Sequence, residues 1–185
     1  MTMMTSPAKT AAGLRAAATL TGAGLALAML AGCSPQPEPT PTETPLFASE
    51  EAAFAAAEET YQAYIAAGNA VDLGAPESFE SVFNWLSDAA LASAKKSYST
   101  MHAEGLVLEG TTTFDSFDLK THTSDEVVAE LCADVSDVAV RSSDGESLVP
   151  ADRIDRQHVE VRFAPSQTRT GLTIARSTYL GEDSC

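Results

Sequence analysis

"EVVAELCADVSDVAV", residues 126–140, decides the fold class of this 185-residue chain. Small and apolar residues occupy every second position, and these are Val127, Ala129, Leu131, Ala133 and Val135. The positions between them hold Val128, Glu130, Cys132 and Asp134. Alternation with a period of two is typical of a strand with one buried face, as in an antiparallel sheet. We therefore predict a strand here, with the first set of residues facing the core.

Further strands are predicted on both sides of this stretch. Residues 106–123 are rich in threonine and aromatic residues, and Asp144-Gly145 between apolar segments is a strong hairpin signal. "QHVEVRF" (157–163) alternates again, and "GLTIARSTYL" (171–180) is predicted as the last strand. The inward-facing residues of the first of these two are predicted to be Val159, Val161 and Phe163. The second half of the chain therefore predicts an antiparallel sheet.

Helices are predicted before residue 105. Ser49 is a suitable N-cap for a first helix that Gly68 would end. A short helix is predicted within residues 77–87, and a third from Asp88 to about Glu104. Their apolar stripes are Phe54, Ala57, Tyr61, Tyr64 and Ile65; Phe79, Val82, Phe83 and Leu86; and Leu91, Ala94, Tyr98 and Met101. Helices followed by hairpin-linked strands predict one α+β domain, residues 49–185.

Residues 1–32 have the features of a secretory signal peptide. They contain Lys9 and Arg15, no acidic residue, and an alanine-rich apolar stretch at 16–31. That stretch is short for a membrane span, although a transmembrane anchor is the alternative.

The four residues "LAGC" (30–33) resemble the lipobox of bacterial lipoproteins. The resemblance implies cleavage between Gly32 and Cys33 and attachment of acyl chains, such as palmitate, to Cys33. Two acyl chains anchor a protein stably, because each buried methylene contributes about 0.8 kcal/mol. The expected location is the extracytoplasmic face of the cell membrane, with the lipid on Cys33 as the contact with the bilayer.

Residues 33–48 are predicted to form a tether, because five prolines alternate with polar residues between Cys33 and Pro45. Such a tract is extended and forms no core.

The cysteine count fits an exported protein. If Cys33 carries lipid, Cys132 and Cys185 remain, and an oxidising compartment permits a disulfide between them. Two free thiols or metal ligands are the alternatives, but two cysteines without a nearby histidine make a poor zinc site. No metal or other cofactor is expected.

The charge excludes some partners. The chain has 11 basic and 26 acidic residues and a net charge of −15, which becomes −17 when Lys9 and Arg15 are removed. Such a charge repels nucleic acid and anionic lipid headgroups.

Several segments together resemble small actinobacterial lipoproteins with a nuclear-transport-factor-2-like domain, also called cystatin-like or SnoaL-like. These segments are "AEGL" (103–106), "GTTTFDS" (110–116), "LCADVSDVAV" (131–140), the Asp-Gly hairpin and the terminal Cys185. The resemblance implies N-terminal helices packed in a strongly curved antiparallel sheet, a cone-shaped α+β roll with a conical pocket. It also implies that Cys132 and Cys185 pair. The superfamily includes isomerases, cyclases, dehydratases, transport factors and assembly modules, so the fold leaves function open.

An isomerase-like site in the cone would need a carboxylate base beside a tyrosine or acid that donates a hydrogen bond. The available residues are Tyr61, Tyr64, Asp115, Asp118 and Asp134. The tyrosines are explained by packing on the apolar stripe of the first helix. The acids are explained by their positions on polar strand faces or in turns. We therefore predict no catalytic residue.

The histidines (His102, His122 and His158) are scattered, and Trp85 lies off the apolar stripe of the short helix. The favoured interpretation is a lipid-anchored, non-enzymatic domain that binds an extracellular protein or a small apolar ligand. The alternative is a pocket enzyme of isomerase or dehydratase type. A cone filled by side chains such as Phe114 or Phe163 would exclude the enzyme.

Overall fold

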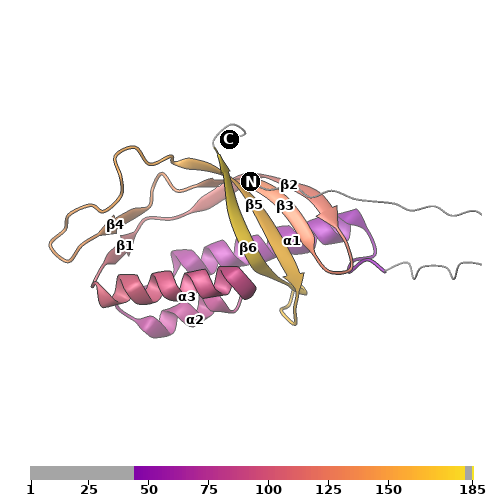
Figure 1. The fold of residues 1–185 in the computed structure, drawn as a ribbon, viewed down its shortest axis with the longest axis horizontal. Coiled ribbons are helices and arrows are strands. Elements are labelled where there is room, and N and C mark those ends of the chain that lie inside the picture. The colour runs from indigo at the N-terminus through magenta and orange to yellow at the C-terminus, as the bar shows by residue number, and fades with distance from the viewer. Residues whose placement is uncertain (1–43, 182–184) are drawn as a thin grey trace, which may run out of the picture. The chain divides into compact units, whose positions relative to one another are not determined.

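The computed structural model describes residues 44–181 and Cys185, all within one compact unit, Pro41–Cys185. In chain order the elements are α1 (Glu50–Asn69), η1 (Pro76–Phe79), α2 (Glu80–Phe83), α3 (Asp88–Ala103), β1 (Val107–Glu109), β2 (Thr113–His122), β3 (Val127–Asp134), β4 (Ala139–Arg141), β5 (Arg156–Pro165) and β6 (Leu172–Gly181). The helices precede the strands and the strands pair antiparallel (Figure 1), which confirms the predicted α+β class. The predicted signal peptide, its cleavage site at Gly32 and Cys33, and the tether up to residue 43 lie outside the described residues.

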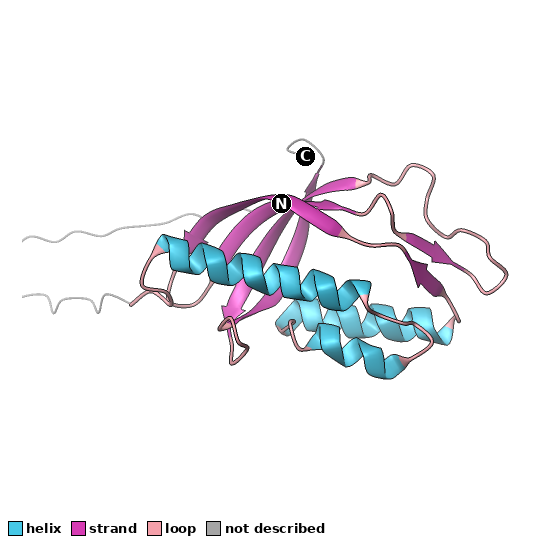
Figure 2. Ribbon diagram, turned by 180° about the vertical axis from the view of Figure 1, so that it is seen from behind, coloured by secondary structure: helices cyan, strands magenta, loops and turns pink. Residues whose placement is uncertain are grey.

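The main sheet is antiparallel, with the strand order β2-β3-β5-β6, while β1 and β4 form a separate two-stranded ribbon. Figure 2 shows the helices on one side of the sheet, which curves over them without closing. Register shifts interrupt the β2–β3 and β5–β6 pairings. Such irregularities bend strands and increase their twist. They give a physical basis for the strongly curved sheet that was predicted.

Helix α1 begins where the sequence predicts. The Ser49 side chain caps it by accepting a hydrogen bond from the Ala52 N–H at 3.2 Å. The small residues Ala53 and Ala57 are completely buried, and Tyr61 is 5% exposed. The helix ends at Asn69, one residue beyond the predicted Gly68.

The core lies between α1 and strands β3, β5 and β6. In the β3–β5 pairing, Ala129 lies opposite Val161 and Leu131 lies opposite Val159. The inward residues predicted for these strands are buried, namely Val127, Ala129, Leu131, Ala133, Val159, Val161 and Phe163. The period-two patterns therefore predicted the core face of both strands correctly. Val135, assigned to the same face, follows the end of β3 and is half-buried.

Cys132 lies on the outer face of β3, yet it is only 2% exposed. In the structure its Sγ atom is bonded to that of Cys185, and the two Cα atoms are 5.6 Å apart. Cys185 therefore lies over a central strand of the sheet. It covers Cys132, which the alternation alone assigns to the polar face.

The predicted apolar stripe of α3 does pack against the core, but it is not fully buried. Leu91, Ala94, Tyr98 and Met101 are only half-buried, and no residue of α3 is fully buried. The physical reason is that α3 does not close onto the sheet along this face, where its residues line a cavity. The helix does end before Gly105, whose φ of +66° suits glycine.

The Asp144-Gly145 hairpin is only partly as predicted. The turn forms, with the Gly145 N–H donating to the Ser142 carbonyl at 2.9 Å. However, β4 pairs with β1 instead of the main sheet, and an isolated bridge joins Arg141 to Ser147 after the turn. The pairing of β1 with β4 joins segments about 30 residues apart, which the local turn signal could not reveal.

The last residues of the predicted tether contact the domain. The Leu46 N–H donates to the Thr123 carbonyl at 2.9 Å, and Leu46 and Phe47 pack against the core. Residues 46 and 47 are therefore not free tether. Among the described residues, no helix has the length and apolar character needed to cross a membrane.

Candidate functional site: a tyrosine-lined cavity

Two adjoining cavities lie between the helices and the sheet. The α3 cavity, of about 440 Å³, is lined by residues of α1, α3 and β6 that include Ala90, Ala94 and Ile174. The β5 cavity, of about 270 Å³, is lined by residues that include Ala133 and Val159. Both cavities share Tyr61, Tyr64, Tyr98, Leu108 and Ser177. The α3 cavity has a volume typical of small-molecule sites.

The aromatic side chains that could have filled the cone do not line these cavities. Phe163 is completely buried in the core. Phe114 packs edge-on against Tyr61, with ring centroids 4.8 Å apart. The cone is therefore open at its tyrosines. The condition that would have excluded a pocket enzyme, a cone filled by these two phenylalanines, is not met.

Tyr61 is the most buried polar group of the site. Its ring is held between Phe114 and Tyr64, with 5.8 Å between the centroids of the two tyrosine rings. Although the residue is only 5% exposed, its hydroxyl has no hydrogen-bond partner within the part of the chain that the structure describes. The hydroxyl is not among the enclosed polar atoms without a partner, so it keeps some accessible surface and is available to a ligand in the cavities that Tyr61 lines.

Tyr64 from α1 and Tyr98 from α3 complete the group. The ring of Tyr98 stacks on Phe79, with centroids 5.2 Å apart. Neither hydroxyl has a hydrogen-bond partner among residues 44–181 and Cys185. The helical pattern predicts Tyr98 only as part of a core stripe, and the structure places it in the site. A phenol on an otherwise apolar stripe was the available signal.

The tyrosine hydroxyls are neutral hydrogen-bond donors at physiological pH. Burial raises the pKa of Tyr61, with a smaller contribution from nearby Tyr64. Burial also raises the pKa of Tyr64, and it raises the pKa of Tyr98 to about 12, again with a contribution from Tyr64. Since a phenol can donate one hydrogen bond and accept others, the three together form a polar patch inside the cavities.

Arg176 of β6 is exposed to solvent and is among the residues that line the α3 cavity. The other arginines of the described region each form an ion pair, and these are Arg141, Arg153, Arg156, Arg162 and Arg169. Arg176 has no carboxylate partner among the described residues. No sequence pattern points to this residue, because its isolation depends on which acids lie near it in space.

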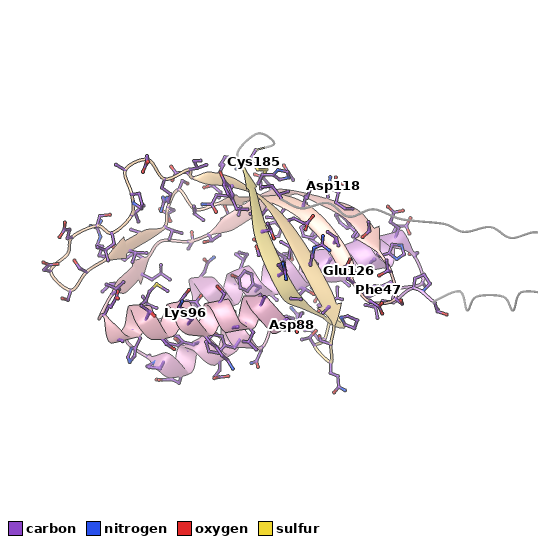
Figure 3. All side chains as sticks on the ribbon, viewed as in Figure 1. Phe47, Asp88, Lys96, Asp118, Glu126 and Cys185 are labelled. Atoms are coloured by element: carbon purple, nitrogen blue, oxygen red, sulfur yellow. A yellow bond between two sulfur atoms is a disulfide. The ribbon has the colours of Figure 1, made fainter. Side chains whose placement is uncertain are left out.

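The acidic residues that sequence analysis considered lie away from the cavities. Asp115 binds Arg156 at 2.9 Å, and the hydrogen bond from this guanidinium lowers the pKa of the carboxyl. Asp134 pairs with the same arginine, and Asp118 binds Lys120 at 2.7 Å. Figure 3 shows Asp118 on the side of the sheet away from α3. The structure therefore separates the candidate carboxylates from Tyr61 and Tyr64.

No described residue that lines the two cavities is an aspartate, glutamate or histidine. The site therefore has hydrogen-bond donors but no carboxylate or imidazole that could accept a proton from a ligand.

The histidines and Trp85 are also outside these cavities. His102 Nδ1 lies 2.7 Å from the Leu73 carbonyl, and His158 Nε2 lies 3.0 Å from Glu130 Oε2. The Arg169 guanidinium lies over the Trp85 ring, with its Cζ atom 5.3 Å from the ring centroid. Within the described ranges, no group of three or more His, Cys, Asp or Glu side chains could hold a metal ion.

No family model matches the sequence, and no curated protein matches it. Among solved structures, one from Novosphingobium aromaticivorans, described as a candidate aromatic ring hydroxylase, has a TM-score of 0.50 at 12% identity, covering 72% of this chain and 93% of that one. The intermembrane space region of chloroplast protein ARC6 gives 0.48 at 15% identity, with coverages of 69% and 96%. A Catenulispora acidiphila protein in complex with S-DNPA gives 0.46 at 11% identity, with coverages of 70% and 93%. The first of these similarities shows a shared α+β fold and extends to fold alone.

Proposed function

We propose that this chain is a lipoprotein of the extracytoplasmic face of the cell membrane, whose α+β domain binds a small apolar molecule in the α3 cavity. The observation that carries the binding role is an open, largely apolar cavity whose tyrosine hydroxyls have no hydrogen-bond partner among the described residues. Small-molecule sites commonly combine an apolar lining with a few polar groups that orient the ligand.

The half-buried face of α3 supports this proposal. Leu86, Ala90, Met101 and Ile174 are among the apolar residues that line the cavity. Burying apolar surface contributes about 25 cal/mol per Å². A bound apolar molecule would therefore remove from water the stripe of α3 that the protein itself leaves partly uncovered.

Among residues 44–181 and Cys185, none that lines the cavities carries a carboxylate or imidazole, which favours binding over isomerase or dehydratase chemistry. Those reactions need a base that removes a proton from the substrate. Neutral phenols can donate hydrogen bonds to a ligand oxygen, but their raised pKa values make them poor bases at physiological pH.

Filling the α3 cavity is expected to weaken binding of an apolar probe. Ala94 lines the cavity, whereas Ala92 on the same helix is exposed and does not. Ala94→Trp should weaken binding of the neutral dye Nile red at least tenfold, because the indole occupies the ligand's volume. Fluorescence titration of the full chain carrying Cys33→Ser measures this without competition from acyl chains.

Ala92→Trp is the matched control, since it makes the same substitution in the same helix. It should bind Nile red like the parent protein. Equal binding by both tryptophan variants, or no binding by the parent, would refute the proposed role of the cavity.

The anchoring proposal rests on "LAGC" at residues 30–33 and on the proline-rich segment that follows. Cys33→Ser should move the protein from the detergent phase to the aqueous phase in a phase-partition assay, because the acyl acceptor is lost. Thr42→Ala, in the same segment, should leave partitioning unchanged. If the Cys33 variant stays in the detergent phase, Cys33 is not the anchor.

A further inference from the structure

We propose that the ligand is an apolar monocarboxylate whose carboxylate binds Arg176 and accepts hydrogen bonds from the tyrosine hydroxyls. This inference rests on the proposed binding function and names its ligand class. The observation that supports it is that a guanidinium and several tyrosine hydroxyls belong to residues lining the same cavity.

The tyrosines require an acceptor. Tyr61, Tyr64 and Tyr98 line both cavities, and their hydroxyls have no hydrogen-bond partner among the residues that the structure describes. A purely hydrocarbon ligand would exclude water from these hydroxyls and leave them unsatisfied, which costs about 1–3 kcal/mol for each group. A ligand that carries acceptor oxygens avoids this loss.

Arg176 gives the sign of the ligand's charge. The chain has 26 acidic residues, and five of the six arginines between residues 44 and 181 bind one or more of them. Arg176 binds none of the described acids, and no described acid lines the cavity beside it. A carboxylate can supply the missing partner, and Arg–carboxylate hydrogen bonds are among the strong ones. A cationic ligand would have no counter-charge in this lining.

The rest of the lining limits the ligand to one charge. Away from the tyrosines and Arg176, much of the cavity surface belongs to Leu86, Ala89, Ala90, Ala94 and Ile174. Ser93, Ser97 and Ser177 also line the cavity, but no described cation other than Arg176 does, so a second carboxylate would have no ion-pair partner there, which is unfavourable. An aliphatic or aromatic body is therefore expected beside the single carboxylate.

Displacement of Nile red tests the ligand class with molecules that differ only in their polar end. Decanoate, decanol and decylamine are titrated against the dye bound to the full chain carrying Cys33→Ser. Decanoate should displace the dye at a concentration at least tenfold lower than either decanol or decylamine.

Two substitutions separate the donors. Arg176→Gln should weaken decanoate binding about tenfold and leave decanol unchanged, since only the ion pair is removed. Tyr61→Phe should weaken decanoate binding severalfold while keeping the aromatic ring. Arg141→Gln is the control, because Arg141 is exposed on β4 and lines neither cavity.

The two proposals fail in different ways. If decanol displaces Nile red as well as decanoate does, or if Arg176→Gln leaves decanoate binding unchanged, the carboxylate assignment is overturned while the cavity remains a binding site. If Nile red does not bind and calorimetry detects no heat with decanoate, both proposals are overturned.

Discussion

Gly110→Ala is expected to lower the free energy of unfolding by about 2–5 kcal/mol. Gly110 connects β1 to β2 and has a φ of +79°, which a residue with a side chain adopts at a cost of about 1–2 kcal/mol. A Cβ atom at this position would also overlap the Asp137 carbonyl oxygen and lie 2.6 Å from its carbonyl carbon. The obstacle is backbone, so the two segments would have to move apart. Urea unfolding monitored by circular dichroism measures the loss.

Gly171→Ala is the matched control. Gly171 has the same φ of +79°, but a Cβ atom there would meet nothing within 4 Å. The control variant therefore has the conformational cost without the overlap. Its free energy of unfolding should fall by only about 1–2 kcal/mol. Equal losses for both variants would show that the close approach of Gly110 to Asp137 is unimportant for stability.

The same substitution should also affect ligand binding. Gly110, Thr112, Val135 and Val138 all line the β5 cavity. Because the Thr111 N–H donates to Asp137 Oδ2 at 3.2 Å, the two segments are joined beside this cavity. Separating them would change the shape of this cavity.

Reduction of the Cys132–Cys185 bond is expected to lower the free energy of unfolding by about 4 kcal/mol. The two cysteines are separated by 53 positions, and closing a loop of this length restricts the unfolded chain strongly. The bond also fixes the terminal residue over β3, and without it Cys132 would leave a buried thiol. Unfolding of the Cys33→Ser protein with and without a phosphine reductant measures the effect.

A Cys132→Ala/Cys185→Ala variant in the same background is the control, because the reductant should not change its stability. Maleimide added to the exported, denatured but unreduced protein should label neither cysteine. Labelling of both would contradict the prediction that the disulfide forms in the cell.

The short-range features of the fold could be predicted from the sequence because their causes are local. Ser49 caps α1 through a bond to Ala52, three residues away. The alternation on β3 and β5 identified which side chains face the core, since successive side chains of a strand point to opposite faces. Lipid attachment at Cys33 remains a prediction, because that residue lies outside the described part of the chain.

The candidate site could be predicted only in part. Tyr61 and Tyr64 were considered, but beside Asp115, Asp118 and Asp134, and the structure places those acids elsewhere. The pattern predicts only packing for Tyr98 and contains no signal for Arg176.

The sequence by itself determined the order of helices and strands, the N-cap of α1, and the core faces of β3 and β5, because each depends on residues that are neighbours within one element. Only the tertiary structure decided that the apolar stripe of α3 lines a cavity, that the tyrosine hydroxyls there have no partners among the described residues, and that Arg176 lies apart from the described acids. The reason is that an apolar stripe indicates a preference for burial. Whether it is covered depends on how closely segments about 80 residues apart, such as α3 and β6, approach one another.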